Sequence, residues 1–253
     1  MRKLLIIGIG AGNPDFVTIQ AIKALNRADV FFIPNKGAEK AELQQLRLEI
    51  CERFIDDRDY RFVDVPMPKR EAAGSDYLGV VRDWHERIEA SYREALTREL
   101  DEDQCGAFLV WGDPGLYDST IRIIDALRAN GFALEYEVIP GISSIQALTA
   151  SHRIPLNMIG EPVLITTGRK LAEGMPADIG TAVVMLDGEQ TFARLAAEDL
   201  DIYWGAYLGA EGETIIAGKL AEVADEIAAT RERLRQAHGW IMDTYLLRRP
   251  KSG

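Results

Sequence analysis

The chain has 253 residues, 47% of them hydrophobic, and can therefore bury a sizeable core in one large domain or two small ones. Its formal net charge of −11 argues against a nucleic-acid partner, because phosphate binding needs a basic field. We expect no signal peptide and no membrane span, since the apolar run after Met1-Arg2-Lys3 is only as long as a strand. Cys51 and Cys105 lie far apart without metal-ligand spacing, so we expect no bound metal. So few cysteines are typical of a protein that resides in a reducing cytoplasm.

The amino end carries the first strong pattern. The apolar run Leu4–Ile7 leads into three alternating glycines, which predicts a buried parallel strand ending in a loop with few side chains. Loops of this kind often hold a nucleotide, but the dinucleotide fingerprint is broken, because Asn13 replaces its third glycine and Pro14 removes a backbone donor. Its acidic residue is also misplaced, since Asp29 stands at the entry of the second strand. A dinucleotide-binding dehydrogenase is therefore disfavoured.

Strands and helices then alternate up to about residue 140. The expected elements are a helix capped by Thr18, a strand over 29–34, a helix over 43–54, a strand over 61–66, a helix over 81–95, a strand over 106–111, a helix from 120 to Gly131 and a strand over 135–139. This alternation predicts a parallel five-stranded sheet in an α/β domain.

Three of these strands end in glycine- and proline-rich turns. The first is the glycine loop, the second is Gly112-Asp113-Pro114-Gly115, and the third is Pro140-Gly141-Ile142-Ser143-Ser144. Because the carboxyl ends of parallel strands meet at one sheet edge, we expect these turns to converge there. That edge is where open α/β folds bind their ligands, and it is our strongest indication of a binding site.

The pattern changes from Pro162 onward. Five further strand candidates have shorter links, at 163–166, 181–186, 203–208, 214–218 and 240–246. One strong helix, marked by Leu220, Val223, Ile227 and Leu234, interrupts them late. We therefore expect two domains, 1–157 and 158–253, the second an α/β domain with a mixed sheet.

Five segments, in order along the chain, form a recognisable set. They are Gly8-x-Gly10-x-Gly12-x-Pro14-Asp15 with Thr18, Ala28-Asp29-Val30, Gly112-Asp113-Pro114-x-x-Tyr117, Ile139-Pro140-Gly141-Ile142-Ser143-Ser144 and Ile154-Pro155-Leu156. Together they resemble the tetrapyrrole (corrin/porphyrin) methylases over most of the chain. The segments 7–15, 20–26, 29–32 with 36–37, and 49–53 resemble the members of this family in the cobalamin pathway that methylate C-1 of precorrin-5 and expel the C-20 unit as acetate.

The resemblance implies a cytoplasmic, homodimeric α/β enzyme of two domains, with the active site in a cleft between them. S-adenosylmethionine would bind there beside a precorrin substrate, without a metal. Carried over by motif, the cofactor-binding residues are Pro14, Gly112, Asp113, Leu116, Ser143 and Ser144, with Met185, Leu186, Tyr207, Leu208, Thr214 and Ile215 from the second domain.

The implied chemistry has two steps with different demands. Methyl transfer needs mainly alignment, because the positive sulfur already activates the methyl group. Acetate release needs a group that deprotonates or orients water, and Asp113 and Tyr117 are the candidates that a motif supports. Asp15, Lys36 and His85 are candidates by residue type alone.

Three roles remain open for Asp113. Its carboxylate can accept a hydrogen bond from the cofactor, it can act on the water, or it can cap the turn at Gly115 or Leu116.

The implied substrate carries carboxylates around its rim, which requires a local basic patch on this acidic chain. The candidate side chains are Lys36, Lys40, Arg61, Lys69, Arg70 and Arg153. Other functions also stay open: methylation at another position or of another tetrapyrrole, a nucleotide-binding dehydrogenase, and a non-catalytic adenosylmethionine-binding protein.

Overall fold

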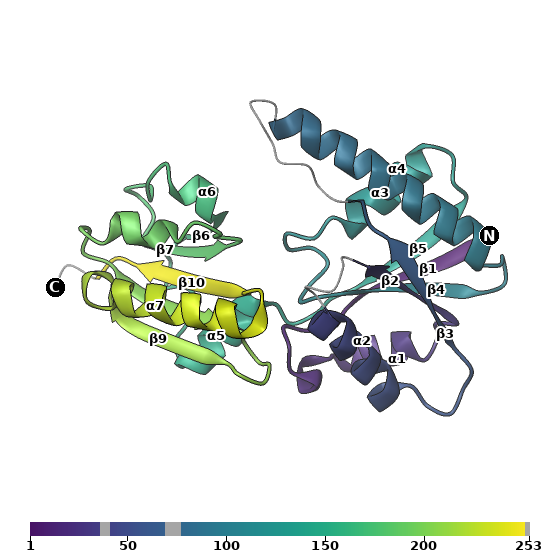
Figure 1. Cartoon of the computed structure of the whole chain (residues 1–253), viewed down its shortest axis with the longest axis horizontal. Helices are drawn as coiled ribbons and strands as arrows, with labels where there is room; N and C mark the ends of the chain where they lie inside the picture. Colours follow the sequence, from purple (N-terminus) through teal and green to yellow (C-terminus); the bar gives the residue numbers. More distant parts are fainter. Residues whose placement is uncertain (36–40, 69–76, 251–253) are drawn as a thin grey trace. The chain divides into compact units, whose positions relative to one another are not determined.

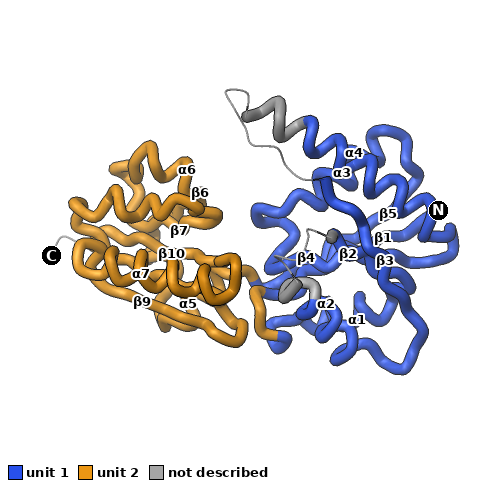
Figure 2. Tube along the Cα trace, in the orientation of Figure 1, with its two compact units in different colours: residues 1–10, 14–142 blue, residues 11–13, 143–253 orange. Residues whose placement is uncertain are grey.

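The computed structural model describes residues 1–35, 41–68 and 77–250. The chain divides into two compact units, residues 1–10 with 14–142 and residues 11–13 with 143–253 (Figure 2). The second unit thus begins earlier than the expected boundary after residue 157. Helix α5 (Ser144–His152) belongs to it, because the buried side chains of Ile145 and Leu148 pack towards β8, β9 and β10, the strands that form one side of its sheet.

The first unit contains the predicted parallel five-stranded sheet. Its strands are β1 (Arg2–Gly8), β2 (Val30–Asn35), β3 (Arg61–Pro66), β4 (Cys105–Val110) and β5 (Leu134–Ile139), in the order β3-β2-β4-β1-β5. β1 lies between β4 and β5 and is buried on both faces: Leu4 and Ile6 join one core cluster, whereas Leu5 and Ile7 join the other. A continuous apolar run is what such a strand requires.

Four helices cover this sheet. Helices α1 (Ile19–Leu25) and α2 (Ala41–Phe54) lie on one face, and α3 (Tyr77–Glu99) and α4 (Thr120–Ala129) lie on the other (Figure 1). A short 3-10 helix, η1 (Pro14–Phe16), precedes α1. The predicted cap is confirmed, because the Thr18 hydroxyl accepts a hydrogen bond from the Ala21 amide at 3.1 Å.

The strand order places a topological switch point between β1 and β4. The chain leaves β1 through α1 towards β2, whereas it leaves the neighbouring β4 through α4, on the opposite face, towards β5. The loops after these two strands therefore part in opposite directions. In open α/β sheets, ligands bind in the crevice that such a divergence creates.

The second unit contains the predicted mixed sheet. Its strands are β6 (Val163–Thr167), β7 (Thr181–Met185), β8 (Asp201–Ala206), β9 (Thr214–Lys219) and β10 (Asp243–Arg248), in the order β6-β7-β10-β8-β9. Only the β6–β7 pair is parallel. The last strand begins later than the predicted residue 240, because Trp240 and Ile241 pack against the core before the strand starts.

The predicted late helix is α7 (Leu220–His238), which ends at Gly239 in the left-handed conformation. With α6 (Gly168–Leu171) and the 3-10 helix η3 (Thr191–Leu195), it packs around the buried Trp204 and Tyr245. Within the described ranges, no helix combines the length and hydrophobicity that crossing a membrane requires.

Candidate functional site

The three predicted turns of the first unit meet at one edge of its sheet. The Ile9 amide donates to the Val110 carbonyl at 2.9 Å, and the Gly112 amide donates to the Gly10 carbonyl at 2.8 Å. The turn after β5 joins them, since the Gly141 amide donates to a carboxylate oxygen of Asp113 at 2.9 Å. The predicted convergence is therefore confirmed, and it lies at the switch point between β1 and β4.

The backbones of these turns touch without intervening side chains. A Cβ atom added to Gly141 would lie 2.0 Å from the Gly112 carbonyl oxygen, and one added to Gly8 would lie 2.6 Å from the Gly141 nitrogen. Gly10 has a φ of +83°, and its added Cβ would meet the Phe16 Cβ at 2.8 Å. These glycines are required by the contact between the turns and by the backbone conformation.

Asp113 ties the second turn to the third. Its Oδ1 atom accepts from the Gly115 amide at 2.8 Å, and its Oδ2 atom accepts from the Gly141 amide at 2.9 Å. The capping role at Gly115 is thus present, together with a contact between turns that sequence reasoning did not foresee. Because a carboxylate offers about four lone-pair positions, Asp113 keeps acceptor capacity for a ligand or a water.

Tyr117, two residues after the second turn, has a strained backbone. Its φ is +54°, a value that bulky residues rarely adopt, and its side chain is 41% exposed. Partial burial raises the pKa of the Tyr117 phenol above its ordinary value of 10, so at neutral pH the hydroxyl can donate a hydrogen bond. Strained residues of this kind cluster at functional sites.

In the second unit, the serines that end the third turn have local partners. The Ser143 hydroxyl accepts from the Ile145 amide at 3.2 Å and donates to Gln146, forming a capping box at the start of α5. The Ser144 hydroxyl lies 3.1 Å from the Thr244 hydroxyl on β10. Ser143 thus secures the helix start, and Ser144 links it to the sheet.

The predicted residues of the second unit gather at one end of its sheet. Met185 pairs with Thr244, Thr244 with Gly205, and Gly205 with Ile215, so that one row crosses β7, β10, β8 and β9. Thr214 adjoins this row on β9, and Ile215 is 40% exposed. Thr244 is buried in the middle of the row and was missed, because an isolated threonine in an apolar strand carries no site signal.

Two further strand ends carry left-handed residues. Leu186, after β7, has a φ of +55°, and Tyr207, after β8, has a φ of +50°. The Tyr207 hydroxyl donates to the Trp240 carbonyl at 2.6 Å, which holds that turn in place. Among the described residues, five non-glycines have a positive φ, and three of them, Tyr117, Leu186 and Tyr207, are predicted site residues.

The glycine loop also supplies residues to the second unit. Residues 11–13 group with it, and a Cβ atom added to Gly12 would lie 2.9 Å from both the Leu208 carbonyl oxygen and the Ala210 nitrogen. Gly12 is therefore in close backbone contact with Leu208 and Ala210, within the second unit. Pro14 begins η1, just beyond that contact.

Each unit by itself presents groups that match part of S-adenosylmethionine, which has a carboxylate, an amine and a purine ring. Leu186 and Ile215 offer exposed apolar side chains for the ring. The buried Trp111 Nε1 atom, beside Gly112, has no hydrogen-bond acceptor among the described residues. A buried donor without an acceptor calls for an explanation, and a ligand carboxylate would provide one.

Among the described residues, the remaining candidates have other surroundings. Asp15 forms an ion pair with Arg53 at 2.6 Å, and Arg61 forms one with Glu99 at 2.9 Å. His85 lies on α3 beside the Trp84 ring. Arg153 ends α5 in the left-handed conformation, and Lys36, Lys40, Lys69 and Arg70 lie outside the described residues.

Arg47 is a half-buried cation that sequence reasoning missed. Its guanidinium donates to the Leu109 carbonyl at 3.0 Å, and burial lowers its pKa. It lies where the sheet opens, because β2 and β4 stop pairing after Phe32 and Phe108. Its place on the charged side of a helical pattern made it look like an ordinary surface arginine.

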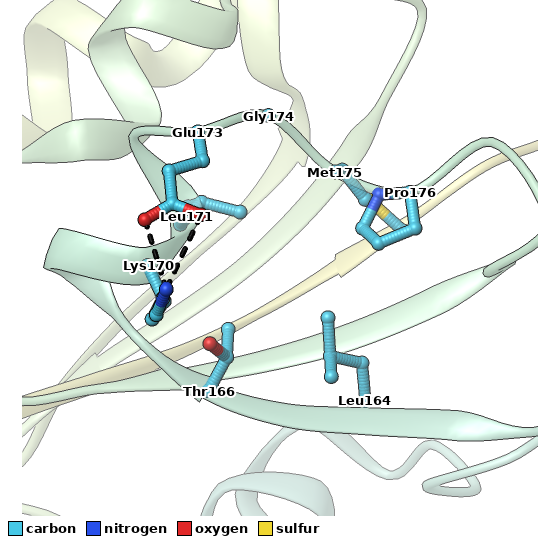
Figure 3. Close-up of a pocket in the computed structure, with 8 residues that line it drawn as sticks. All are labelled: Leu164, Thr166, Lys170, Leu171, Glu173, Gly174, Met175 and Pro176. Carbon is cyan, nitrogen blue, oxygen red and sulfur yellow. Dashed lines mark hydrogen bonds and ion pairs between the residues drawn. The ribbon is translucent and has the colours of Figure 1, made fainter.

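A surface pocket of about 430 Å³ opens beside β6 of the second unit (Figure 3). Leu164 and Thr166 of the edge strand β6 line it, with the segment from Lys170 to Pro176. An ion pair of 3.0 Å joins Lys170 to Glu173 there. None of the predicted site residues lines this pocket.

Comparisons with known proteins agree with this geometry. The family model of the Tetrapyrrole (Corrin/Porphyrin) Methylases matches residues 3–224. The chain is 56% identical to precorrin-6A synthase [deacetylating] of Sinorhizobium sp, over 98% of this chain and 96% of that protein. It is 26% identical to a probable cobalt-precorrin-2 C(20)-methyltransferase of Methanocaldococcus jannaschii, over 88% of this chain and 90% of that protein.

Solved structures show the same fold. A protein related to cobalamin synthesis (CobF) from Corynebacterium diphtheriae superposes with a TM-score of 0.85 and 38% identity, covering 99% of this chain and 100% of that chain. Uroporphyrin-III C-methyl transferase from Thermus thermophilus, complexed with S-adenyl homocysteine, has a TM-score of 0.57 and 18% identity, covering 97% and 96%.

Proposed function

This chain belongs to the tetrapyrrole (corrin/porphyrin) methylases, and we propose that it is an S-adenosylmethionine-dependent C-methyltransferase of cobalamin biosynthesis. The proposed reaction methylates C-1 of precorrin-5 and releases the C-20 unit as acetate, which gives precorrin-6A. The observation that carries this proposal is the 56% identity to precorrin-6A synthase [deacetylating] over nearly the whole of both chains. The resemblance further supports a cytoplasmic homodimer.

We assign cofactor binding to residues at the strand ends and turns of each unit. In the first unit these are Pro14, Gly112, Asp113 and Leu116. In the second they are Ser143, Ser144, Met185, Leu186, Tyr207, Leu208, Thr214 and Ile215. The strained backbone at Leu186 and Tyr207 supports this assignment, because the chain keeps conformations there that it would not adopt for packing alone.

For methyl transfer, the protein's task is alignment. The bound cofactor supplies a methyl group that its positive sulfur already activates, so this step needs neither a metal nor a strong base. The contacts among Gly10, Gly112 and Gly141 make the turns rigid. Rigid turns can hold the reacting carbon in line with the methyl group and the sulfur of the cofactor.

For acetate release, we assign different roles to Tyr117 and Asp113. The Tyr117 phenol is protonated at neutral pH and can donate to the oxygen of the departing acyl group. Asp113 positions the turn through two backbone amides, and its remaining lone pairs can orient the attacking water.

The direct test is incubation with precorrin-5 and S-adenosylmethionine labelled in the methyl group. We expect one labelled methyl group per product and one acetate per turnover, followed by mass spectrometry and an acetate assay. Methylation without acetate would reassign the chain to another position on the macrocycle. Labelling of uroporphyrinogen III alone would reassign its tetrapyrrole substrate.

A thermal-shift titration separates the other classes. Because a ligand that binds only the folded state raises the melting temperature, S-adenosylhomocysteine should stabilise the protein and NAD should not. A shift with NAD alone would contradict the methylase assignment. A shift with S-adenosylhomocysteine but no turnover of any tetrapyrrole would favour a non-catalytic binding protein.

A further inference from the structure

Leu186 combines backbone strain with exposure. It follows β7 directly, has a φ of +55° and is 67% exposed. The left-handed conformation lowers the stability of the folded chain when leucine adopts it, whereas glycine adopts it at almost no cost in free energy. Since most of the side chain lies outside the core, packing within the chain does not explain why leucine occupies this position. The side chain is therefore suited to contact something other than this unit's interior.

The next residue, Asp187, is the centre of a buried hydrogen-bond cluster. Its Oδ1 atom accepts from the Glu189 amide at 3.1 Å and from the Thr191 hydroxyl at 3.0 Å. Its Oδ2 atom accepts from the Thr191 amide at 2.7 Å and from the Tyr245 hydroxyl at 2.6 Å. Four donors thus hold one carboxylate: three belong to the same turn, and the fourth, the Tyr245 hydroxyl, comes from β10.

The cluster is anchored to the rest of the unit from three sides. The Arg231 guanidinium donates to the Asp187 carbonyl at 2.9 Å and forms an ion pair of 2.9 Å with Asp243, the two side chains being only 6% and 7% exposed. Asp243 also accepts from the Trp204 indole at 3.0 Å. On the remaining side, a Cβ atom added to Gly168 would lie 2.3 Å from the Asp187 carboxylate. Such a fully satisfied network leaves the turn little freedom.

We infer that Asp187 is a positioning residue, whose hydrogen bonds hold Leu186 in the left-handed conformation so that its exposed side chain forms an apolar surface for the purine ring of S-adenosylmethionine. This inference rests on the proposed function, and it adds Asp187, Tyr245 and Arg231 to the residues on which cofactor affinity depends. The purine is the largest flat apolar part of that ligand, which matches an exposed leucine rather than a polar side chain.

The substitution Leu186→Gly separates ligand contact from stability. Glycine relieves the strain and loses little packing, so we expect an unchanged or higher melting temperature. Loss of the apolar contact should weaken S-adenosylhomocysteine binding about 5- to 30-fold, as measured by calorimetry. A residue that served only the fold would show the opposite result, with a lower melting temperature and unchanged affinity.

The substitution Asp187→Asn tests the positioning role, because the amide cannot accept from all four donors. We expect the KM for S-adenosylmethionine to rise about tenfold while kcat at saturating cofactor stays within about threefold of the parent value. The reason is that the apolar surface formed by Leu186 contacts the cofactor equally in the ground state and the transition state. Tyr245→Phe removes one donor and should give a smaller change in the same direction. Val183→Ala is the control, because it weakens the buried middle of the same strand without touching the turn.

The outcomes distinguish this inference from the proposed function. If the parent protein binds no S-adenosylhomocysteine, the proposed function fails. If the parent binds it and Leu186→Gly binds equally well, the inference fails and the function stands. Should Asp187→Asn not fold, Leu186→Gly and Tyr245→Phe decide the question by the same measurements. An equal rise in KM for Val183→Ala at matched stability would also overturn the positioning role.

Discussion

The removal of the Asp113 carboxylate tests how the turns of the first unit are held together. In the structure, the two oxygens of this side chain accept from the amides of Gly115 and Gly141. Asp113→Ala deletes both bonds, whereas Asp113→Asn keeps one acceptor oxygen and places an NH2 group against the other amide. The two variants should therefore lower the free energy of unfolding by different amounts.

The magnitude follows from the surroundings of each bond. The Gly115 amide is exposed, so water can replace its acceptor at little cost, whereas the Gly141 amide is partly buried. A hydrogen bond to a charged group is worth roughly 1.5–3 kcal/mol, and the Gly141 bond should supply most of the loss. For a chain of this size, that loss corresponds to a fall of roughly 3–12 °C in melting temperature.

Loosening the third turn should also reduce ligand affinity. We expect Asp113→Ala to weaken S-adenosylhomocysteine binding, measured by calorimetry, and to slow methyl transfer and acetate release together. Asp118→Ala is a matched control, because Asp118 accepts one backbone amide, that of Thr120 at 2.7 Å, without linking two turns. It should lose stability with little change in affinity.

Two results would refute this reasoning. A variant with native stability and native affinity would show that the contact between turns is dispensable. A variant that binds the ligand and methylates normally but releases no acetate would instead assign Asp113 to the attacking water, with an expected rate loss of about 10²–10⁴-fold.

Three further substitutions or treatments give short tests. Gly10→Val should lower the free energy of unfolding by at least about 1 kcal/mol, because its φ is +83° and its Cβ would meet Phe16; equal chemical denaturation curves would contradict this. Trp111→Phe removes an indole donor that has no acceptor among the described residues, so it should leave the melting temperature unchanged while weakening S-adenosylhomocysteine binding about 3- to 20-fold, and unchanged affinity would exclude a ligand role. Burial raises the pKa of Cys51 to about 12, so its thiolate is scarce below that pH; iodoacetamide at pH 8 should modify it only after unfolding, as peptide mass spectrometry can show.

The sequence by itself determined the order and type of the elements. The apolar run in β1, the helical spacing in α7 and the cap at Thr18 are local features, because burial period and capping depend on neighbouring residues only. The positions of the glycine turns could be predicted for the same reason. Their convergence followed from one geometric rule, that parallel strands end at a common edge.

Only the tertiary structure decided which side chains act together. The bond from Gly141 to Asp113 spans turns on different strands, and the Asp187–Tyr245 bond joins residues 58 positions apart. Arg47, Thr244 and Asp187 have no motif around them, because each has a partner in a distant element: Leu109, Ser144 and Tyr245 respectively. Their roles depend on strand order and on contacts between distant segments, and a local pattern of residues does not encode either one.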